Sequence, residues 1–444
     1  MNLTIKNCTI VNEGKLSEND LLIKNGRIEK IDTSIDVKGD FIEAEGLHLL
    51  PGFIDDQVHF REPGLTDKGS IRSESIAAVV GGTTSFMDMP NVVPPTLNMD
   101  LWNQKNRIAE QGSLANYSFY MGSSNTNIEE IKSIDPSQVC GLKVFMGTST
   151  GNLLVDDPKA LEDIFNFSPV LITTHCEDTP LITENEKKAY EKFGDNIPIE
   201  LHEEIRSRQA CLISTEKAID LAQQFNSKLH VLHISTKDEI ELFDAGPIEN
   251  KKITSEVCIP HLLFSSSDYE NLGSLIKCNP SIKANSDKTA LRQALKKGVI
   301  DYVATDHAPH RLSEKEKSYI NSPSGMPSVQ HSFLAVLEMV HDGDIEITDV
   351  PKITSHNVAK RFEIKDRGFI KEGFWADLVL VNMNDLYEVK KEKIFYKCGW
   401  SPFESYTFKS RIVETIINGE RVCSQGKILS DKIGQKLEFS RRYK

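Results

Sequence analysis

Two kinds of hydrophobic pattern alternate along the chain and divide it into three parts. In the first fifty residues, short apolar stretches such as LTIKNCTIV and DLLIKNGRIEKI alternate with turn signals such as Asn25-Gly26, a pattern typical of antiparallel strands. From about residue 52, short apolar strands are followed by longer helical patterns, and the strand-and-turn pattern returns from about residue 366. We therefore predict that residues 1–51 and 366–444 form one composite β domain and that residues 52–365 form an α/β unit.

The central part contains about eight strand candidates, among them TTSFMDMP, KLHVLHIS and DYVATDHAP. Repeated strand and helix units indicate parallel strands, and no Gly-x-Gly-x-x-Gly dinucleotide fingerprint follows them. The number of strands and the length favour a (β/α)8 TIM-like barrel over an open doubly wound sheet, so the expected fold class is α/β. The charged stretch RLSEKEKSYINSPSG, residues 311–325, is expected to be a mobile loop or an ordinary solvated surface loop.

Composition and charge narrow the class of protein. The chain carries 52 basic and 65 acidic residues, a net charge of −13, which disfavours nucleic acid and anionic membranes as partners. Eight cysteines are spread over the chain without a Cys-x-x-Cys pair, which fits reduced thiols and predicts a cytoplasmic protein. The N-terminus has no signal-peptide pattern, and no run of apolar residues is long enough to span a membrane, so export and membrane insertion are not expected.

Polar residues that can bind a metal close several of the predicted strands. They are His59 in QVHF, Lys143 in GLKVF, His175 in LITTHCED, His233 in HVLHIS and Asp306 in VATDHAPH. One such histidine is usually structural, but five residues on five strands of a parallel barrel would meet at the end where active sites lie. Imidazole and carboxylate ligands suit a divalent ion such as Zn²⁺.

Lys143 needs a separate explanation, because an ammonium group repels a metal ion. Reaction of its amine with CO2 would give a carbamate, whose two oxygens can bridge two metals. A salt bridge inside the barrel is the alternative, and the residues alone leave it open.

The motifs HFREPG, MPN, KVFMG, THCED, LHIS and TDHAPH together resemble the cyclic amidohydrolases, and REPG with MPN resembles the dihydroorotases among them. The resemblance covers nearly the whole chain. It implies a zinc-dependent enzyme that reversibly cyclises N-carbamoyl-L-aspartate to L-dihydroorotate in de novo pyrimidine biosynthesis. It also implies a homodimer.

The resemblance assigns roles to individual residues. Lys143 would be the carboxylated bridging ligand, His175 and His233 would complete one metal site, and His59 and Asp306 would hold the other. Asp306 would also be the acid/base that moves the proton. The residues implied to contact substrate are Arg61, Asn91, Asn279, His310 and the backbone near Ser324 and Gly325. Arg61 suits a substrate carboxylate, and as it follows His59 by two we expect the two side chains to share a strand face.

Two departures from the family pattern concern the site. Gln57 stands where the family has a second histidine of His-x-His, and an amide oxygen is a weaker zinc ligand than imidazole. Lys283, in KCNPSIK, stands where an arginine is common. We therefore expect one or two zinc ions per chain, one bound tightly by Lys143, His175 and His233 and one bound loosely.

Two other functions remain open. A hydantoinase or dihydropyrimidinase-like enzyme would have the same metals with a different pocket, and Arg61 argues against it because hydantoins carry no carboxylate. A catalytically inactive subunit of an assembly would explain the loss of one ligand, but the other ligands and the inferred substrate contacts are all present.

Overall fold

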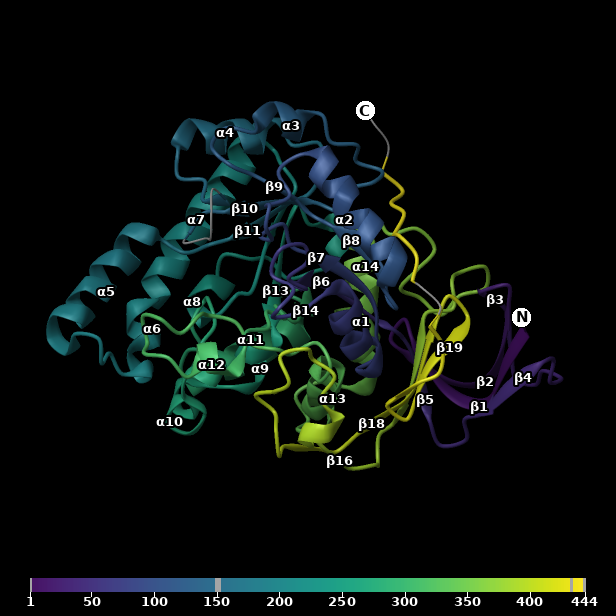
Figure 1. Ribbon diagram of the computed structural model, residues 1–444. Coiled ribbons are helices and arrows are strands. Elements are labelled where there is room, and N and C mark those ends of the chain that lie inside the picture. Colours follow the sequence, from purple (N-terminus) through teal and green to yellow (C-terminus); the bar gives the residue numbers. More distant parts are fainter. Residues whose placement is uncertain (1, 148–152, 432–433, 442–444) are drawn as a thin grey trace.

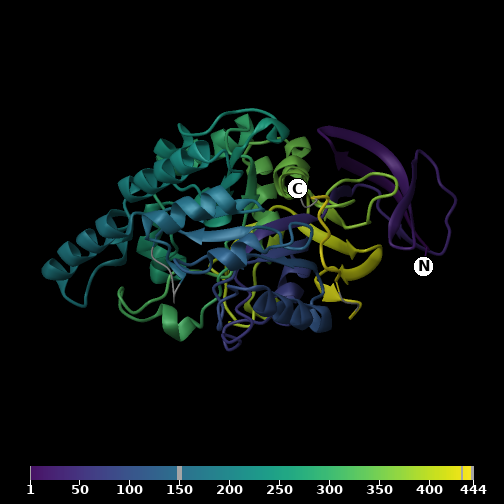
Figure 2. The same ribbon diagram turned by 90° about the horizontal axis from the view of Figure 1, so that it is seen from above.

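A barrel of parallel strands and a twisted sheet at its side make up the molecule (Figure 1). The computed structural model describes residues 2–147, 153–431 and 434–441. Figure 2, a view from above, shows the same arrangement, with the sheet at one side of the barrel and helix α5 (Thr179–Phe193) projecting at the opposite side.

Among the described residues, eight parallel strand positions form the barrel, as the sequence predicted. They are β6 (Phe53–Val58), β7 (Thr83–Asp88), β8 (Asn116–Phe119) with its continuation β9 (Met121–Gly122), β10 (Leu142–Phe145), β11 (Ile172–His175), β12 (Leu229–Val231), β13 (Ile253–Cys258) and β14 (Tyr302–Ala304). Strands β6 to β8 pair in sequence, and so do β9 to β14. The last strand returns to the first where the His59 amide donates to the His307 carbonyl at 2.7 Å.

Helices between these strands cover the outside of the barrel (Figure 1). The longer ones are α1 (Ile71–Val80), α2 (Met99–Gly112), α4 (Pro158–Phe167), α7 (Arg208–Gln224), α11 (Asn285–Lys297) and α13 (Ser332–His341). The short ones are α3 (Ile128–Lys132), α6 (His202–Ile205), α8 (Lys237–Ile240), α9 (Ile259–Leu263), α10 (Tyr269–Leu272), α12 (Leu312–Lys315) and α14 (Asn357–Phe362). Polar residues at several N-termini define where helices begin, since the side chains of Asn98, Asp157 and Ser207 accept hydrogen bonds from the first turns of α2, α4 and α7.

Segments from both ends of the chain build the lateral sheet, which confirms the predicted composite β unit. Its strands are β1 (Asn2–Asn12), β2 (Lys15–Lys24), β3 (Arg27–Asp32), β4 (Asp40–Glu43), β5 (His48–Pro51), β15 (Leu378–Asn382), β18 (Arg411–Ile417), β19 (Glu420–Ser424) and β20 (Lys427–Ile428). The N-terminal β5 pairs with the C-terminal β15, and this pairing joins the two halves.

Parts of the C-terminal segment lie against the barrel rather than in this sheet. The short strands β16 (Tyr387–Glu388) and β17 (Thr407–Phe408) belong to a loop whose Tyr396 hydroxyl donates to the ring of His331. Residues 434–441 run beside β8, where the Tyr117 amide donates to the Gln435 carbonyl at 3.0 Å. The boundaries 51/52 and 365/366 stay predictions.

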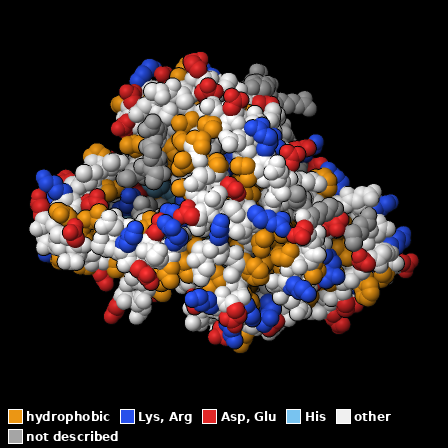
Figure 3. Space-filling view, viewed as in Figure 1, with side chains coloured by type: hydrophobic (Ala, Val, Ile, Leu, Met, Phe, Trp, Pro, Cys, Tyr) orange, Lys and Arg blue, Asp and Glu red, His pale blue; other side chains and the backbone are white. Residues whose placement is uncertain are grey.

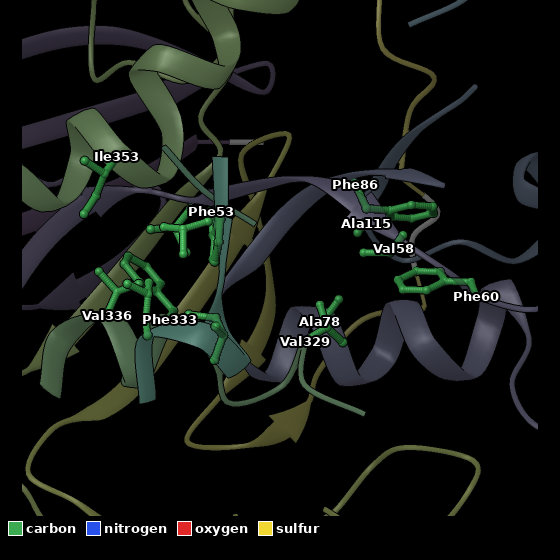
Figure 4. Close-up of a cluster of buried hydrophobic side chains, with 14 of the residues drawn as sticks. Phe53, Val58, Phe60, Ala78, Phe86, Ala115, Val329, Phe333, Val336 and Ile353 are labelled. Carbon is green, nitrogen blue, oxygen red and sulfur yellow. The ribbon is translucent and has the colours of Figure 1, made fainter. Parts of the chain in front are cut away.

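Aromatic and aliphatic side chains fill the space beneath the strand that leads to His59. Phe60 packs on Phe86 with ring centroids 4.4 Å apart, and Phe53 lies 6.0 Å from Phe333 of α13 (Figure 4). The Phe60 amide also donates to the Asp88 carboxylate at 2.8 Å. Burial of such rings stabilises the fold by about 2 kcal/mol each and fixes the backbone at the end of β6.

On the face shown in Figure 3, acidic and basic side chains are interspersed with apolar ones. None of the helices among the described residues combines the length and the apolar character needed to span a lipid bilayer. All eight cysteines are free thiols, as their spacing predicted.

Candidate active site

Four of the expected side chains form two close pairs at the C-terminal ends of barrel strands. Beyond β6 and β14, Nε2 of His59 lies 3.1 Å from Oδ1 of Asp306. At the ends of β11 and β12, Nδ1 of His175 lies 2.9 Å from Nε2 of His233. Because parallel strands end at one face of a barrel, the fold brings these residues together although up to 247 positions separate them.

Lys143, on β10, is the fifth expected side chain and is only 1% exposed. Burial lowers the pKa of its amine to about 8, while the nearby charges of Asp306 and Glu256 oppose this shift. A larger fraction of the amine is therefore uncharged near neutral pH than for an exposed lysine. An uncharged amine is the form that reacts with CO2, so the environment favours the carbamate chemistry expected from the sequence.

A buried carboxylate fixes the orientation of His175. Oε2 of Glu177 lies 2.8 Å from Nε2 of His175 and forms an ion pair with Arg206. Burial alone would raise the pKa of Glu177, but the charge of Arg206 and the His175 hydrogen bond hold it at about 2. Glu177 therefore stays ionised and accepts the Nε2 proton of His175, which leaves Nδ1 with a free lone pair.

His59 has a similar arrangement. Its Nδ1 lies 2.7 Å from Oδ1 of Asn91, the residue of the MPN motif, so Nδ1–H donates to the amide oxygen. In the neutral form of the ring, the lone pair of Nε2 faces Asp306. Gln57 lies beside them, where its Nε2 donates to Oδ1 of Asp306 at 3.2 Å and its Oε1 lies 3.5 Å from the thiol of Cys258.

Arg61 and His310 lie in contact next to these pairs. Nη2 of Arg61 is 2.9 Å from Nε2 of His310, and its Nε donates to the Pro309 carbonyl at 3.0 Å. The expectation that Arg61 shares a strand face with His59 is wrong, because β6 ends at Val58 and Arg61 has a left-handed backbone with φ of 70°. The turn, rather than strand alternation, directs the guanidinium to His310.

The remaining expected substrate contacts lie on two neighbouring segments. The Ser324 carbonyl is 3.1 Å from Nε2 of His310. Gly325 has φ of 125°, and a Cβ there would lie 2.7 Å from the Ala308 carbonyl oxygen, so only glycine fits. Asn279 is half-buried, and within the described residues its buried Oδ1 has no hydrogen-bond partner, which leaves that oxygen available to a ligand.

Three residues at this face have a strained backbone. Besides Arg61, His233 and Asp306 have positive φ values of 41° and 47°. Such conformations cost non-glycine residues about 1 kcal/mol or more and cluster at functional sites.

Sequence reasoning missed a second group of polar residues inside the barrel. Ligand atoms of Asp56, His230 and Glu256 lie within 4.8 Å of one another, a group that could hold a metal ion. Burial raises the pKa of both carboxyls, and the Tyr302 hydroxyl donates to Asp56 at 3.1 Å. Nε2 of His230 lies within hydrogen-bond distance of both the Tyr302 hydroxyl and Oε2 of Glu256, so the group is already joined into a network. The sequence signal for this group was Asp56, the second aspartate of FIDD. We interpreted that predicted strand only for its histidine, His59.

Comparison with known proteins places this geometry in a family. The model of the amidohydrolase family matches residues 48–422. The dihydroorotase of Methanosarcina acetivorans is 32% identical over 90% of this chain and 87% of its own length, and the allantoinase of Bacillus velezensis is 30% identical over 95% and 94%. Among solved structures, the L-hydantoinase (dihydropyrimidinase) of Arthrobacter aurescens superposes with a TM-score of 0.92 at 24% identity, covering 98% of this chain and 99% of that one. The chain belongs to the amidohydrolase family.

Proposed function

We propose that the protein is a zinc-dependent dihydroorotase, which interconverts N-carbamoyl-L-aspartate and L-dihydroorotate. The observation that carries the proposal is the buried guanidinium of Arg61, held against His310 beside the His59–Asp306 pair. Of dihydroorotate, dihydrouracil, hydantoin and allantoin, only dihydroorotate carries a carboxylate. A guanidinium binds a carboxylate through two parallel charged hydrogen bonds. The names of the archaeal relatives support the same substrate.

The donor atoms fit a divalent metal ion. The free Nδ1 lone pair of His175 faces Nε2 of His233, and the Nε2 lone pair of His59 faces a carboxylate oxygen of Asp306. In each pair, neutral imidazole nitrogens and the carboxylate oxygen can act as ligands to a cation placed between them. Lys143, as a carbamate, would add oxygens toward both pairs.

When bound, zinc would supply a water of lowered pKa and polarise the amide carbonyl of the substrate. Asp306 would take up a proton at the start of ring opening and return it to the leaving nitrogen, with the steps reversed for cyclisation. Both of its described side-chain contacts use Oδ1, so Oδ2 is the atom to carry the proton. Arg61, His310 and Asn279 would bind and orient the ring.

The two metal positions should differ in strength. Where a second histidine would stand, Gln57 offers only a neutral amide oxygen, and its present contact with Asp306 is through the amide nitrogen. We infer a tight zinc at Lys143, His175 and His233 and a loose one at His59 and Asp306. Two zinc ions retained per chain after long dialysis against a mild chelator would refute this asymmetry.

A substrate panel tests the proposed reaction. Hydrolysis of dihydroorotate, dihydrouracil, hydantoin and allantoin is measured for the wild type, for Arg61→Met and for Arg107→Met, which changes an exposed arginine of α2. We expect dihydroorotate to be preferred, with kcat/KM lowered on the order of a hundredfold by Arg61→Met alone, since a charged hydrogen-bonded pair is lost. Preference for hydantoin, dihydrouracil or allantoin would contradict the proposal.

Two further properties belong to the same proposal. We infer a homodimer from the family resemblance, to be checked by sedimentation velocity. A cytoplasmic location is supported by eight free thiols, seven of them buried, because reducing compartments preserve such cysteines.

A further inference from the structure

Two buried lysines hold the segment 311–325, which borders the candidate site. Lys315, at the end of α12, is fully buried, and its Nζ donates to the carbonyl oxygens of Lys277 at 3.1 Å, Pro323 at 2.8 Å and Gly325 at 2.8 Å. An ammonium has three N–H donors, so these bonds use all of them. The amine acts as an internal cation that gathers three backbone carbonyls.

Lys277 binds backbone carbonyls in a similar way. Its Nζ donates to the carbonyls of Tyr319 at 2.5 Å and Ser322 at 2.7 Å and lies 4.1 Å from the centre of the Tyr319 ring. Among the described residues, neither lysine forms an ion pair with a carboxylate; the described hydrogen bonds of both amines go to backbone oxygens. Buried lysines are usually paired with acids, so this carbonyl clamp, defined as Lys277 and Lys315 with the carbonyls they bind, is unusual.

The carbonyl clamp joins the two segments expected to contact substrate. One is the connection after β13 that carries Asn279, and the other is the turn that contains Ser324 and Gly325. The Gly325 amide donates to the Lys277 carbonyl at 2.8 Å, and the same carbonyl accepts from Lys315. Lys315 therefore fixes the separation of Asn279 from Gly325 without reaching the reacting atoms itself.

We propose that Lys315 is a positioning residue for the substrate, which sets the spacing between Asn279 and the Ser324–Gly325 backbone. The proposal rests on the proposed function for the identity of the ring that enters there. The clamp itself follows from the contacts alone. Without it, the segment 316–325 has to be ordered each time substrate binds, and that cost appears in KM.

The charges around Lys315 make the clamp sensitive to pH. Burial lowers the pKa of Lys315 to about 7, the charges of Lys277 and Arg61 act in the same direction, and Cys278 opposes them. His310 also faces this amine, and burial with the neighbouring cations keeps its own pKa far below the usual value, so it stays neutral. Above this pH the amine of Lys315 has two donors, and its lone pair faces a carbonyl oxygen.

The amine of Lys277 should lose its proton at a slightly higher pH than that of Lys315. Burial lowers its pKa to about 8, the charge of Arg206 adds to this effect, and Glu186 opposes it. The Tyr319 ring lies against the amine, and burial raises the pKa of its hydroxyl above the usual value, so the hydroxyl does not titrate in the same range. The clamp should therefore weaken as pH rises from about 7 to about 9.

Hydrogen exchange and kinetics test the role of Lys315. Amide exchange of residues 316–325, corrected for intrinsic rates, is measured with KM and kcat for dihydroorotate in the wild type, Lys315→Met and the matched control Lys317→Met, an exposed lysine of the same segment. We expect Lys315→Met to raise both exchange and KM on the order of tenfold, with kcat changed less than about threefold and zinc content unchanged. Lys317→Met should match the wild type.

The wild type provides a test that does not depend on a folded variant. Protection of residues 316–325 should fall between pH 6.5 and pH 9, while protection of the barrel strands stays constant. Wild-type values of protection and KM in Lys315→Met, or protection of this segment independent of pH, would overturn the proposal. If no variant hydrolyses dihydroorotate, the proposed function fails, whereas the exchange data still decide whether the carbonyl clamp exists.

Discussion

Removal of the Glu177 carboxylate should weaken metal binding by changing the proton on His175. With Glu177→Met, no acceptor holds the proton at Nε2 of His175, and Nδ1, which faces His233, can be protonated instead. Loss of a partner behind a metal-binding histidine typically lowers metal affinity 10- to 100-fold, or about 1.4 to 2.7 kcal/mol. Glu177→Gln keeps an oxygen at the same place and should lower affinity much less.

Stability has to be separated from metal binding in this experiment. Glu177→Met leaves Arg206 buried without its carboxylate, which should cost about 3–5 kcal/mol of unfolding free energy. The double variant Glu177→Met/Arg206→Met removes that lone charge and should regain most of the stability without regaining metal affinity. Glu184→Gln, on the exposed surface of α5, is the control.

Zinc affinity is measured by competition with a chromophoric chelator, and unfolding by urea titration followed by circular dichroism. The reasoning would be refuted if Glu177→Met bound zinc as tightly as the wild type. It would also fail if the double variant recovered wild-type affinity, because the single variant would then have lost metal only through instability.

Four further predictions follow from the site and its surroundings. Lys143→Ala should lose tightly bound zinc along with turnover, measured by metal analysis after dialysis, and retention of a full complement would contradict the bridging role. Arg61→Lys should raise KM for dihydroorotate on the order of tenfold with a smaller change in kcat, because one ammonium cannot replace the two parallel bonds of a guanidinium. Burial raises the pKa of Asp55 to about 8, so the folded state keeps a proton that the unfolded chain releases above about pH 4. Unfolding free energy should therefore fall as pH rises from about 4 to about 8, and Asp55→Asn should reduce this slope by up to about 1.4 kcal/mol per pH unit, as followed by denaturant titrations at pH 5 and pH 8. Gly325→Ala should lower kcat/KM at least about tenfold, because its Cβ would meet the Ala308 carbonyl, and unchanged kinetics would show that the turn adapts.

The fold could be predicted from the sequence because each barrel strand is a short apolar run with a helical pattern after it. The association of the two chain ends, seen in the pairing of β5 with β15, could also be predicted, because both ends show the same strand-and-turn pattern. The path of residues 434–441 along β8 could not be predicted, because nothing in their local pattern distinguishes a strand of the lateral sheet from one beside the barrel.

Within the site, residues at strand ends were predictable and their supports were not. His59, His175 and Asp306 close apolar strands, and the rule that parallel strands end at one face brought them together. Glu177 and Arg206 are 29 residues apart and meet only because α6 folds back on the turn after β11. Strand alternation failed for Arg61 because the pairing of β6 with β7 changes register between Asp55 and Val58 and β6 ends before His59.

The carbonyl clamp shows the same limit. The stretch 311–325 is charged and polar, a pattern that indicates a solvated loop, and Lys315 is one of two lysines in it. Its burial depends on carbonyl oxygens from Lys277, 38 residues earlier. Backbone groups leave no signature in a sequence, so a lysine that binds them cannot be told from one that faces water.

The most direct test of the account is dihydroorotate hydrolysis at alkaline pH with zinc content determined on the same dialysed sample. The account predicts robust turnover with about one tightly bound zinc ion per chain, because Gln57 weakens one metal position while Lys143, His175 and His233 keep the other. Bound zinc without turnover of dihydroorotate would contradict it, and would indicate a different ring substrate or a subunit without activity.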